Sequence, residues 1–280
     1  MCSAARVVKK ISTDECVVGV TSVDDELFLL LERDNNQVAV YSINDYQLLR
    51  HLNLHGLKPH YINDMTSCVR HKCLYMSDFH NSCIHRYDLS RTFRARMKRL
   101  VCNRITQWSV PYKPVGLSVT PSCNLLVTCR GEPNKLVELS ADSGKCVREI
   151  SIHRDMVNPW HGVQLTTGQL VVCHGYCHSD LHRVCAAMVG DDVKLSRNFG
   201  GRRGTYITEL NVPCHLAVDK DSQFIFVADR DNRRVVLLSP TLEFVRHFTE
   251  GLSRPQQLYF HQATRRLFVG QWKSVTVIQL

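Results

Sequence analysis

The sequence predicts an all-β fold in which six blades close into one β-propeller. Six stretches of the chain repeat the same pattern of short apolar strands separated by polar turns. The last stretch ends after its third strand, and a spare strand precedes the first one. No Pro-, Ser- or Gly-rich linker divides the 280 residues, so a single domain is expected over residues 1–280.

The clearest repeat runs from Val212 to Phe248 and sets the pattern for the others. Its strands are expected at His215–Val218, Phe224–Ala228, Val235–Leu238 and Phe244–Phe248. The separating segments are rich in Asp, Asn, Ser and Pro, which favour turns. Strands of about five residues joined by short turns are typical of an antiparallel meander.

The six blades are expected at residues 12–54, 59–110, 114–153, 159–199, 212–248 and 255–280, with residues 5–11 supplying the missing strand of the last. Proline opens five of them, where a fixed φ and a missing backbone donor are tolerated. The second strands are expected to end at Arg33, Asp78, Arg130, His174, Asp229 and Gln271. A solenoid is the competing fold, but it would need capped ends, whereas a closed ring leaves no long unpaired edge.

The composition indicates the cellular compartment and the kind of partner to expect. The thirteen cysteines are odd in number and lie mostly in apolar runs, which is typical of buried free thiols in a reducing compartment. The N-terminus has no signal-peptide pattern, and the longest apolar run, around Leu27–Leu31, is too short to span a membrane. We therefore expect a cytoplasmic, monomeric domain with no membrane contact. The net charge of +9 favours polyanionic or acidic partners.

The block from Asn198 to Phe248 resembles an NHL repeat. The resemblance lies in the glycine-bearing lead-in, Pro213, "LAVD" ending at Asp219, "FVAD" ending at Asp229, and "NRRVVLL" from Asn232. The Gly-His and Trp-Asp signature of WD40 blades is absent from the sequence. Within this block Asp229 and Asn232 are expected to bond backbone groups of their turn, and Arg233 is expected to reach carbonyl oxygens or Asp229.

The resemblance implies a target-recognition propeller like that at the C-terminus of tripartite-motif ubiquitin ligases, which selects proteins or RNA. Ligase activity would need a RING domain, and this chain contains no RING, B-box or heptad segment, so it is expected to be a fragment or a standalone propeller. Some six-bladed relatives are peptide lyases or lactone hydrolases. The alternative is therefore a metal-dependent propeller enzyme.

The face that carries the second-to-third-strand turns and the blade connections is the expected binding surface. Basic groups there alternate with aromatic rings, which suits either a protein hot spot or stacked single-stranded RNA. The residues expected to bind the partner are Arg33, Lys113, Arg130, Trp160, His161, Tyr176, Arg202, Arg203, Arg230, Arg233, Arg254 and Trp272.

Three other features are interpreted as structural. The loop "GGRRG", Gly200–Gly204, precedes a strand and not a helix, so it does not form a phosphate loop. The basic run Arg91–Arg99 is expected to be a solvated excursion on the opposite face. The cysteines and histidines of the fourth blade are expected to be buried thiols and surface imidazoles, with no metal. No motif indicates a catalytic residue or a cofactor.

Overall fold

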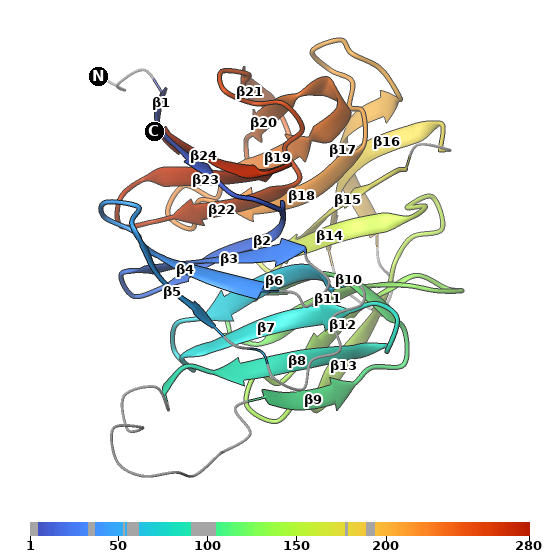
Figure 1. The fold of residues 1–280 in the computed structure, drawn as a ribbon. Helices are drawn as coiled ribbons and strands as arrows, with labels where there is room; N and C mark the ends of the chain where they lie inside the picture. Colours follow the sequence, from blue (N-terminus) through green and yellow to red (C-terminus); the bar gives the residue numbers. More distant parts are fainter. Residues whose placement is uncertain are drawn as a thin grey trace.

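The chain is a six-bladed β-propeller, as the sequence predicts. The computed structural model describes residues 5–32, 37–52, 54, 62–90, 105–176, 179–188 and 194–280. Its strands form six four-stranded antiparallel sheets arranged around a central axis (Figure 1). Each sheet is a meander in which consecutive strands are neighbours, apart from the sheet that closes the ring.

Each blade uses its strands in the same radial order. The inner strands are β2 (Cys16–Val23), β6 (Ile62–Cys68), β10 (Lys113–Val119), β14 (Pro159–Gln164), β18 (Pro213–Val218) and β22 (Gln257–His261). The second strands are β3 (Glu26–Glu32), β7 (Cys73–Asp78), β11 (Leu125–Arg130), β15 (Leu170–His174), β19 (Ile225–Asp229) and β23 (Arg266–Gln271). The third strands are β4 (Gln37–Ser42), β8 (Cys83–Asp88), β12 (Lys135–Leu139), β16 (Leu181–Met188), β20 (Arg234–Leu238) and β24 (Ser274–Gln279). The outer strands are β5 (Leu48–Leu52), β9 (Ile105–Ser109), β13 (Cys146–Ser151), β17 (Lys194–Arg202), β21 (Phe244–Phe248) and β1 (Arg6–Ser12).

The N-terminal strand closes the ring. β1 pairs antiparallel with β24, from Arg6 opposite Gln279 to Ser12 opposite Ser274 (Figure 1). Ile11 of β1 is buried in a cluster that also holds residues of the first blade. The spare strand at one end of the chain thus supplies the outer strand missing at the other end, which confirms the predicted closure.

The predicted second-strand ends are confirmed in five blades. β7, β11, β15, β19 and β23 end at the predicted residues. β3 ends at Glu32, and Arg33 lies outside the described residues. The basic run Arg91–Arg99 also lies outside them, so its predicted position stays a prediction.

The core consists of apolar side chains packed between neighbouring blades. The second strand of every blade is buried along nearly its whole length because sheets cover both of its faces. The ten described cysteines are free thiols, and eight of them are buried. No helix in the described part of the chain is long and apolar enough to cross a lipid bilayer.

Strand direction gives the ring two distinct faces. The blade-to-blade connections and the second-to-third-strand turns lie at one end of the strands, and we call this the connector face. The first-to-second-strand turns lie at the other end, the hairpin face. The predicted binding surface corresponds to the connector face.

Candidate functional site

On the connector face, the residue that ends β19 holds a connection in place. The Asp229 carboxylate is buried and accepts hydrogen bonds from the backbone N–H of Asn211 (2.6 Å), from Asn232 Nδ2 (2.8 Å) and from Arg234 Nε (2.7 Å). The Arg234 guanidinium also donates to the carbonyl oxygens of Tyr206 (2.9 Å) and Glu209 (2.6 Å). The connection between the fourth and fifth blades is therefore fixed by side-chain hydrogen bonds.

The end of β23 fixes the next connection in the same way. Gln271 Oε1 accepts from the Ser253 N–H at 2.6 Å, and its Nε2 donates to the Gly251 carbonyl at 3.2 Å. Asp231 joins the two regions, because its carboxylate accepts from Arg254 (2.9 Å) and from Arg230 (3.1 Å). Residues 202–212, 229–234, 249–256 and 271–274 therefore form one continuous surface, which we call the basic sector.

The basic sector exposes positive charge beside large apolar groups. Within it, Trp272 is 63% exposed, Tyr206 76% and Ile207 48%. Its exposed acidic residue is Glu250, and its exposed basic residues are Arg202, Arg203, Arg233, Arg254 and Lys273. Asp229 and Asp231, the sector's two aspartates, are already paired with arginines.

The predicted residues nearer the central axis are engaged with one another. The Arg130 guanidinium lies 3.9 Å above the Trp160 ring and donates to the Pro159 carbonyl. Burial lowers the pKa of Arg130 to about 10, so it remains charged at neutral pH. The ring of Tyr176 lies 5.5 Å from that of Trp160, whose Nε1 donates to the Gly175 carbonyl. These contacts join the third blade to the fourth and leave little free ring surface.

Two predicted roles are wrong. His161 is buried in the central channel and takes no part in the connector face. Arg233, expected to reach Asp229, is exposed with φ of +55°, and it is Arg234 that bonds the carboxylate. The turn between β19 and β20 has four residues, one turn of 3-10 helix over Arg230–Asn232 and then Arg233 in the left-handed conformation. Arg234 is therefore the first side chain that faces inward, which the sequence pattern does not reveal. The remaining predicted cation, Lys113, is exposed near the ring of Phe79.

The histidines of the fourth blade are not surface groups. His161, His174 and His182 are all buried, as are Cys173 and Cys185, so only the cysteine half of the prediction is confirmed. Cys177 and His178 lie outside the described residues. Each imidazole has a hydrogen-bond partner inside the protein: His161 bonds the Leu117 carbonyl of the third blade, and His174 lies 3.4 Å from the Cys185 thiol. His182 accepts from the Val212 N–H of the connection to the fifth blade.

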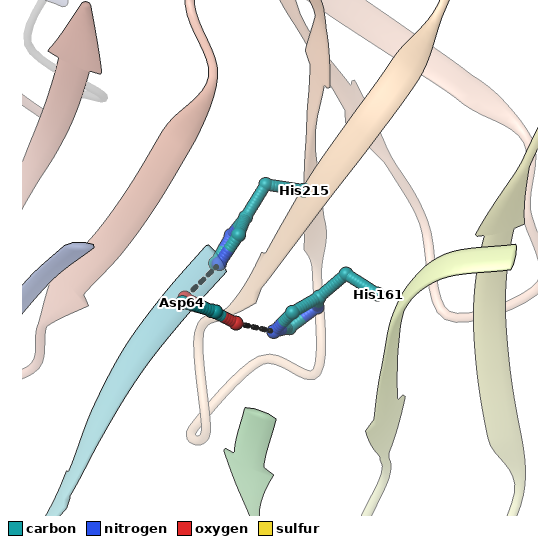
Figure 2. A group of neighbouring side chains, drawn as sticks. All are labelled: Asp64, His161 and His215. Atoms are coloured by element: carbon teal, nitrogen blue, oxygen red, sulfur yellow. Dashed lines mark hydrogen bonds and ion pairs between the residues drawn. The ribbon is translucent and has the colours of Figure 1, made fainter. Parts of the chain in front are cut away.

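A polar cluster that the sequence did not predict closes the central channel. Asp64, His161 and His215 come from three inner strands, β6, β14 and β18, and converge on the axis (Figure 2). Each follows a one-residue irregularity in the pairing of its strand with the second strand. Such β-bulges re-aim the next side chain, and here the side chains point toward the axis.

Hydrogen bonds through this cluster link five blades, from the second to the sixth. The Asp64 carboxylate accepts from its neighbour Met65 N–H (2.8 Å) and from Leu117 N–H of β10 (2.7 Å). Its oxygens lie 3.4 Å from His215 Nε2 and 3.6 Å from His161 Nε2. The close approach of β14 to β10 requires Gly116, because a Cβ there would lie 2.4 Å from the Trp160 carbonyl oxygen.

The two imidazoles are held in one tautomer each. His215 Nδ1 accepts the Leu258 N–H at 3.3 Å, so its hydrogen lies on Nε2. His161 Nε2 donates to the Leu117 carbonyl at 3.0 Å. The nitrogens that face Asp64 therefore carry hydrogens and have no lone pair for a metal ion. As they stand, the three residues do not fit a metal site.

A cavity of about 440 Å³ lies in the channel beside this cluster. It is lined by the second halves of the inner strands and by first-to-second-strand turns, so it lies toward the hairpin face, whose exposed Arg70 and Lys220 are among its lining residues. Two pairs of lining hydroxyls bond each other, Thr21 with Ser67 (2.7 Å) and Ser22 with Tyr259 (2.6 Å). The cavity and the basic sector are therefore at opposite ends of the ring.

Buried imidazoles are expected to make the fold less stable in acid. Burial lowers the pKa of His161 to about 3 and that of His174 to about 4. Below their ordinary pKa of about 6.5 the unfolded chain binds protons that the native state does not, so stability falls as pH drops from there toward 4. Each histidine contributes at most about 1.4 kcal/mol per pH unit. Urea unfolding at about pH 7 and about pH 5 measures the effect; equal stabilities would contradict it. A His174→Phe variant should show a shallower slope.

Comparisons with known proteins support the fold. No family model matches the sequence, and no curated protein matches it, so the resemblance to NHL repeats stays a prediction. The structure is similar to the β-propeller domain of Cps50 (Swd1) from Myceliophteria thermophila, with 11% identity, 99% of each chain covered and a TM-score of 0.67. It is also similar to Kuenenia stuttgartiensis hydrazine synthase (14% identity, 94% and 83% covered, TM-score 0.66). A virginiamycin B lyase from Staphylococcus aureus gives 10% identity, 99% of each chain covered and a TM-score of 0.63.

Proposed function

We propose that this chain is a non-catalytic, NHL-type docking module that binds an acidic protein segment on its basic sector. The observation that carries the proposal is the combination of exposed Trp272 and Tyr206 with exposed arginines on connections held by internal hydrogen bonds. Trp, Tyr and Arg are the residues that dominate protein-binding hot spots. A surface that is already ordered loses little conformational entropy when it binds.

An acidic protein is favoured over single-stranded RNA because of where the aromatic rings are. RNA recognition by stacking needs several free ring faces along a basic groove. The Trp160 and Tyr176 rings pack on each other, and Arg130 covers Trp160. The exposed groups that remain, Trp272, Tyr206 and aliphatic Ile207, suit a protein surface with apolar anchors and a charged rim.

The enzymatic alternative has weaker support. A lyase or hydrolase would need an acid or base in the channel that exchanges protons near neutral pH. The pKa of His161, lowered to about 3 chiefly by burial and next by His215, keeps that imidazole neutral there. Both nitrogens of His215 face partners, the Leu258 N–H and Asp64. The cluster is better suited to joining blades than to transferring protons.

Charge reversal in the basic sector is expected to abolish docking. Arg202→Glu combined with Arg203→Glu replaces two exposed cations. Because Arg203 Nε also donates to Asn211 Oδ1 at 2.9 Å, the fold of the double variant is checked by circular dichroism and melting temperature before binding is compared. The measurement is quantitative affinity capture from nuclease-treated lysate, comparing the double variant and Trp272→Ala with the unchanged chain. We expect the proteins retained by the unchanged chain to fall at least about tenfold with each variant, the effect of losing one hot spot of about 1.4 kcal/mol or more.

The matched control reverses charge at the opposite end of the ring. Arg70→Glu with Lys220→Glu changes the net charge by the same amount on the hairpin face. If this control loses the same proteins, the interaction depends on net charge alone and the basic sector is not the site. If nuclease removes the captured material and binding falls steeply with salt, the partner is RNA and the proposal of a protein partner is wrong.

A further inference from the structure

The second and fifth blades carry the same turn after their second strands. Asp78 ends β7 as Asp229 ends β19, and an asparagine follows three residues later in both, Asn81 and Asn232. In both turns the asparagine Nδ2 donates to the aspartate Oδ2 at 2.8 Å. The two aspartates are also equally buried, at 1% and 0% exposure. The two sites therefore correspond position by position.

The two sites differ in what neutralises the buried carboxylate. In the fifth blade the residue five positions after the aspartate is Arg234, whose guanidinium lies 2.7 Å from Asp229. In the second blade the corresponding residue is Cys83. A buried carboxylate is costly unless a positive charge compensates it. Within the described part of the chain, no lysine or arginine takes the place of Arg234 beside Asp78.

A thiol and an imidazole occupy the place of that cation. Cys83 and His85 are two residues apart on β8, so their side chains lie on the same face of the strand, and both are buried. His85 Nε2 lies 3.1 Å from Asp78 Oδ2 and 3.5 Å from Cys83 Sγ. Thiolate, imidazole and carboxylate are the three side-chain ligands that zinc uses in proteins.

We propose that Asp78, Cys83 and His85 bind a zinc ion, which supplies the positive charge that Arg234 supplies in the fifth blade. The three ligand atoms all lie within 4.8 Å of one another. Tetrahedral zinc with bonds of about 2.0–2.3 Å needs ligand-to-ligand distances of about 3.3–3.6 Å. The two measured separations are close to these values, so small shifts are enough to admit the ion. Three protein ligands leave the fourth position for water.

The tautomer of His85 permits coordination. Without a metal, His85 Nε2 donates to the Asp78 carboxylate, while its Nδ1 has no hydrogen-bond partner in the described part of the chain. When zinc replaces that hydrogen bond, the hydrogen moves to Nδ1 and the lone pair of Nε2 binds the metal. The imidazoles of the channel cluster differ, since backbone groups hold their hydrogens on Nε2. Asn81 donates to both oxygens of Asp78, from its backbone N–H and from Nδ2, and so orients the ligating carboxylate.

The proposal is tested with zinc and cobalt alone as probes. The purified chain, incubated with zinc chloride and desalted, is expected to retain one equivalent of zinc by elemental analysis. Cobalt should give a thiolate-to-metal charge-transfer band that zinc abolishes. Loss of a residue that only hydrogen-bonds a metal ligand lowers metal affinity roughly 10–100-fold. Cys83→Ser removes a ligand itself, so it should lower the zinc affinity by more than this and should remove the cobalt charge-transfer band.

Two further variants make the outcome decisive. Cys83→Arg restores the arrangement of the fifth blade, so this variant is expected to fold, to bind no zinc and to melt at a temperature that chelators do not change. Cys185→Ser is the matched control, because it removes a buried thiol that lies 3.4 Å from His174. Among the described residues no carboxylate joins this pair to form a metal site, so the zinc content should stay unchanged. Absence of zinc from the unchanged chain, or zinc retained by a folded Cys83→Ser variant, would overturn the proposal. Neither result bears on docking at the basic sector.

Discussion

Asp64→Ala is expected to lower the free energy of unfolding by about 3–5 kcal/mol, the usual cost of removing one partner from a buried charged cluster. The variant leaves the Leu117 N–H and the His215 Nε2–H buried without an acceptor, and each such donor costs about 1–3 kcal/mol. Because the carboxylate links β6 to β10 and faces side chains of β14 and β18, its loss weakens the joints between blades. Urea unfolding followed by circular dichroism measures the change.

The sign of this change separates a structural role from a catalytic one. Residues kept for catalysis often lower stability, so their removal is neutral or stabilising. A more stable Asp64→Ala protein would therefore contradict the structural interpretation and favour an active site in the channel. Asp221→Ala is the matched control, because Asp221 is exposed and its loss should stay within about 0.5 kcal/mol. Asp64→Asn keeps the size of the side chain but places an amide N–H against hydrogen-bond donors. Its loss of stability should lie between those of Asp64→Ala and Asp221→Ala.

Deleting residues 1–12 is expected to lower the melting temperature by about 10 °C or more and to make the protein self-associate. The deletion removes β1, leaves the outer edge of β24 unpaired and uncovers the apolar cluster around Ile11. Burial of one such side chain alone contributes about 1.5–3 kcal/mol, and each kcal/mol corresponds to about 2–4 °C at this chain length. An unpaired strand edge is also a template for pairing with another chain.

Scanning calorimetry and sedimentation at two protein concentrations test this deletion. Val8→Ser provides the control, because Val8 lies on the same strand, is 37% exposed and belongs to none of the apolar clusters, so the change should cost no more than about 1 kcal/mol. A truncated protein that melts with the intact one would show that pairing of β1 with β24 does not hold the ring closed. Self-association without loss of stability would assign β1 only the role of protecting the edge.

The metal proposal shows what the repeat pattern could and could not reveal. Aligning "DFHNSCIH" at Asp78 with "DRDNRRVV" at Asp229 places Cys83 opposite Arg234, so the exchange is visible in the sequence. Only the structure shows which arginine bonds Asp229, because the turn geometry decides whether Arg233 or Arg234 points inward. A similar signal existed for the channel, since Pro-x-His opens both β14 and β18.

Local alternation of apolar and polar residues was enough to determine the blades and their strand ends, because strand pairing within a meander joins residues close in sequence. The closure by β1 joins the two ends of the chain, and the sequence indicated it by a spare strand before the first blade and a missing strand in the last. The channel cluster depended on tertiary structure, since Asp64 and His215 are 151 residues apart and meet only after bulges turn them toward the axis. Burial of His161 and pairing of Arg130 with Trp160 likewise follow from the approach of neighbouring blades. Sequence periodicity reports which side of a strand a residue occupies, whereas closure of the ring decides whether that side meets solvent or another blade.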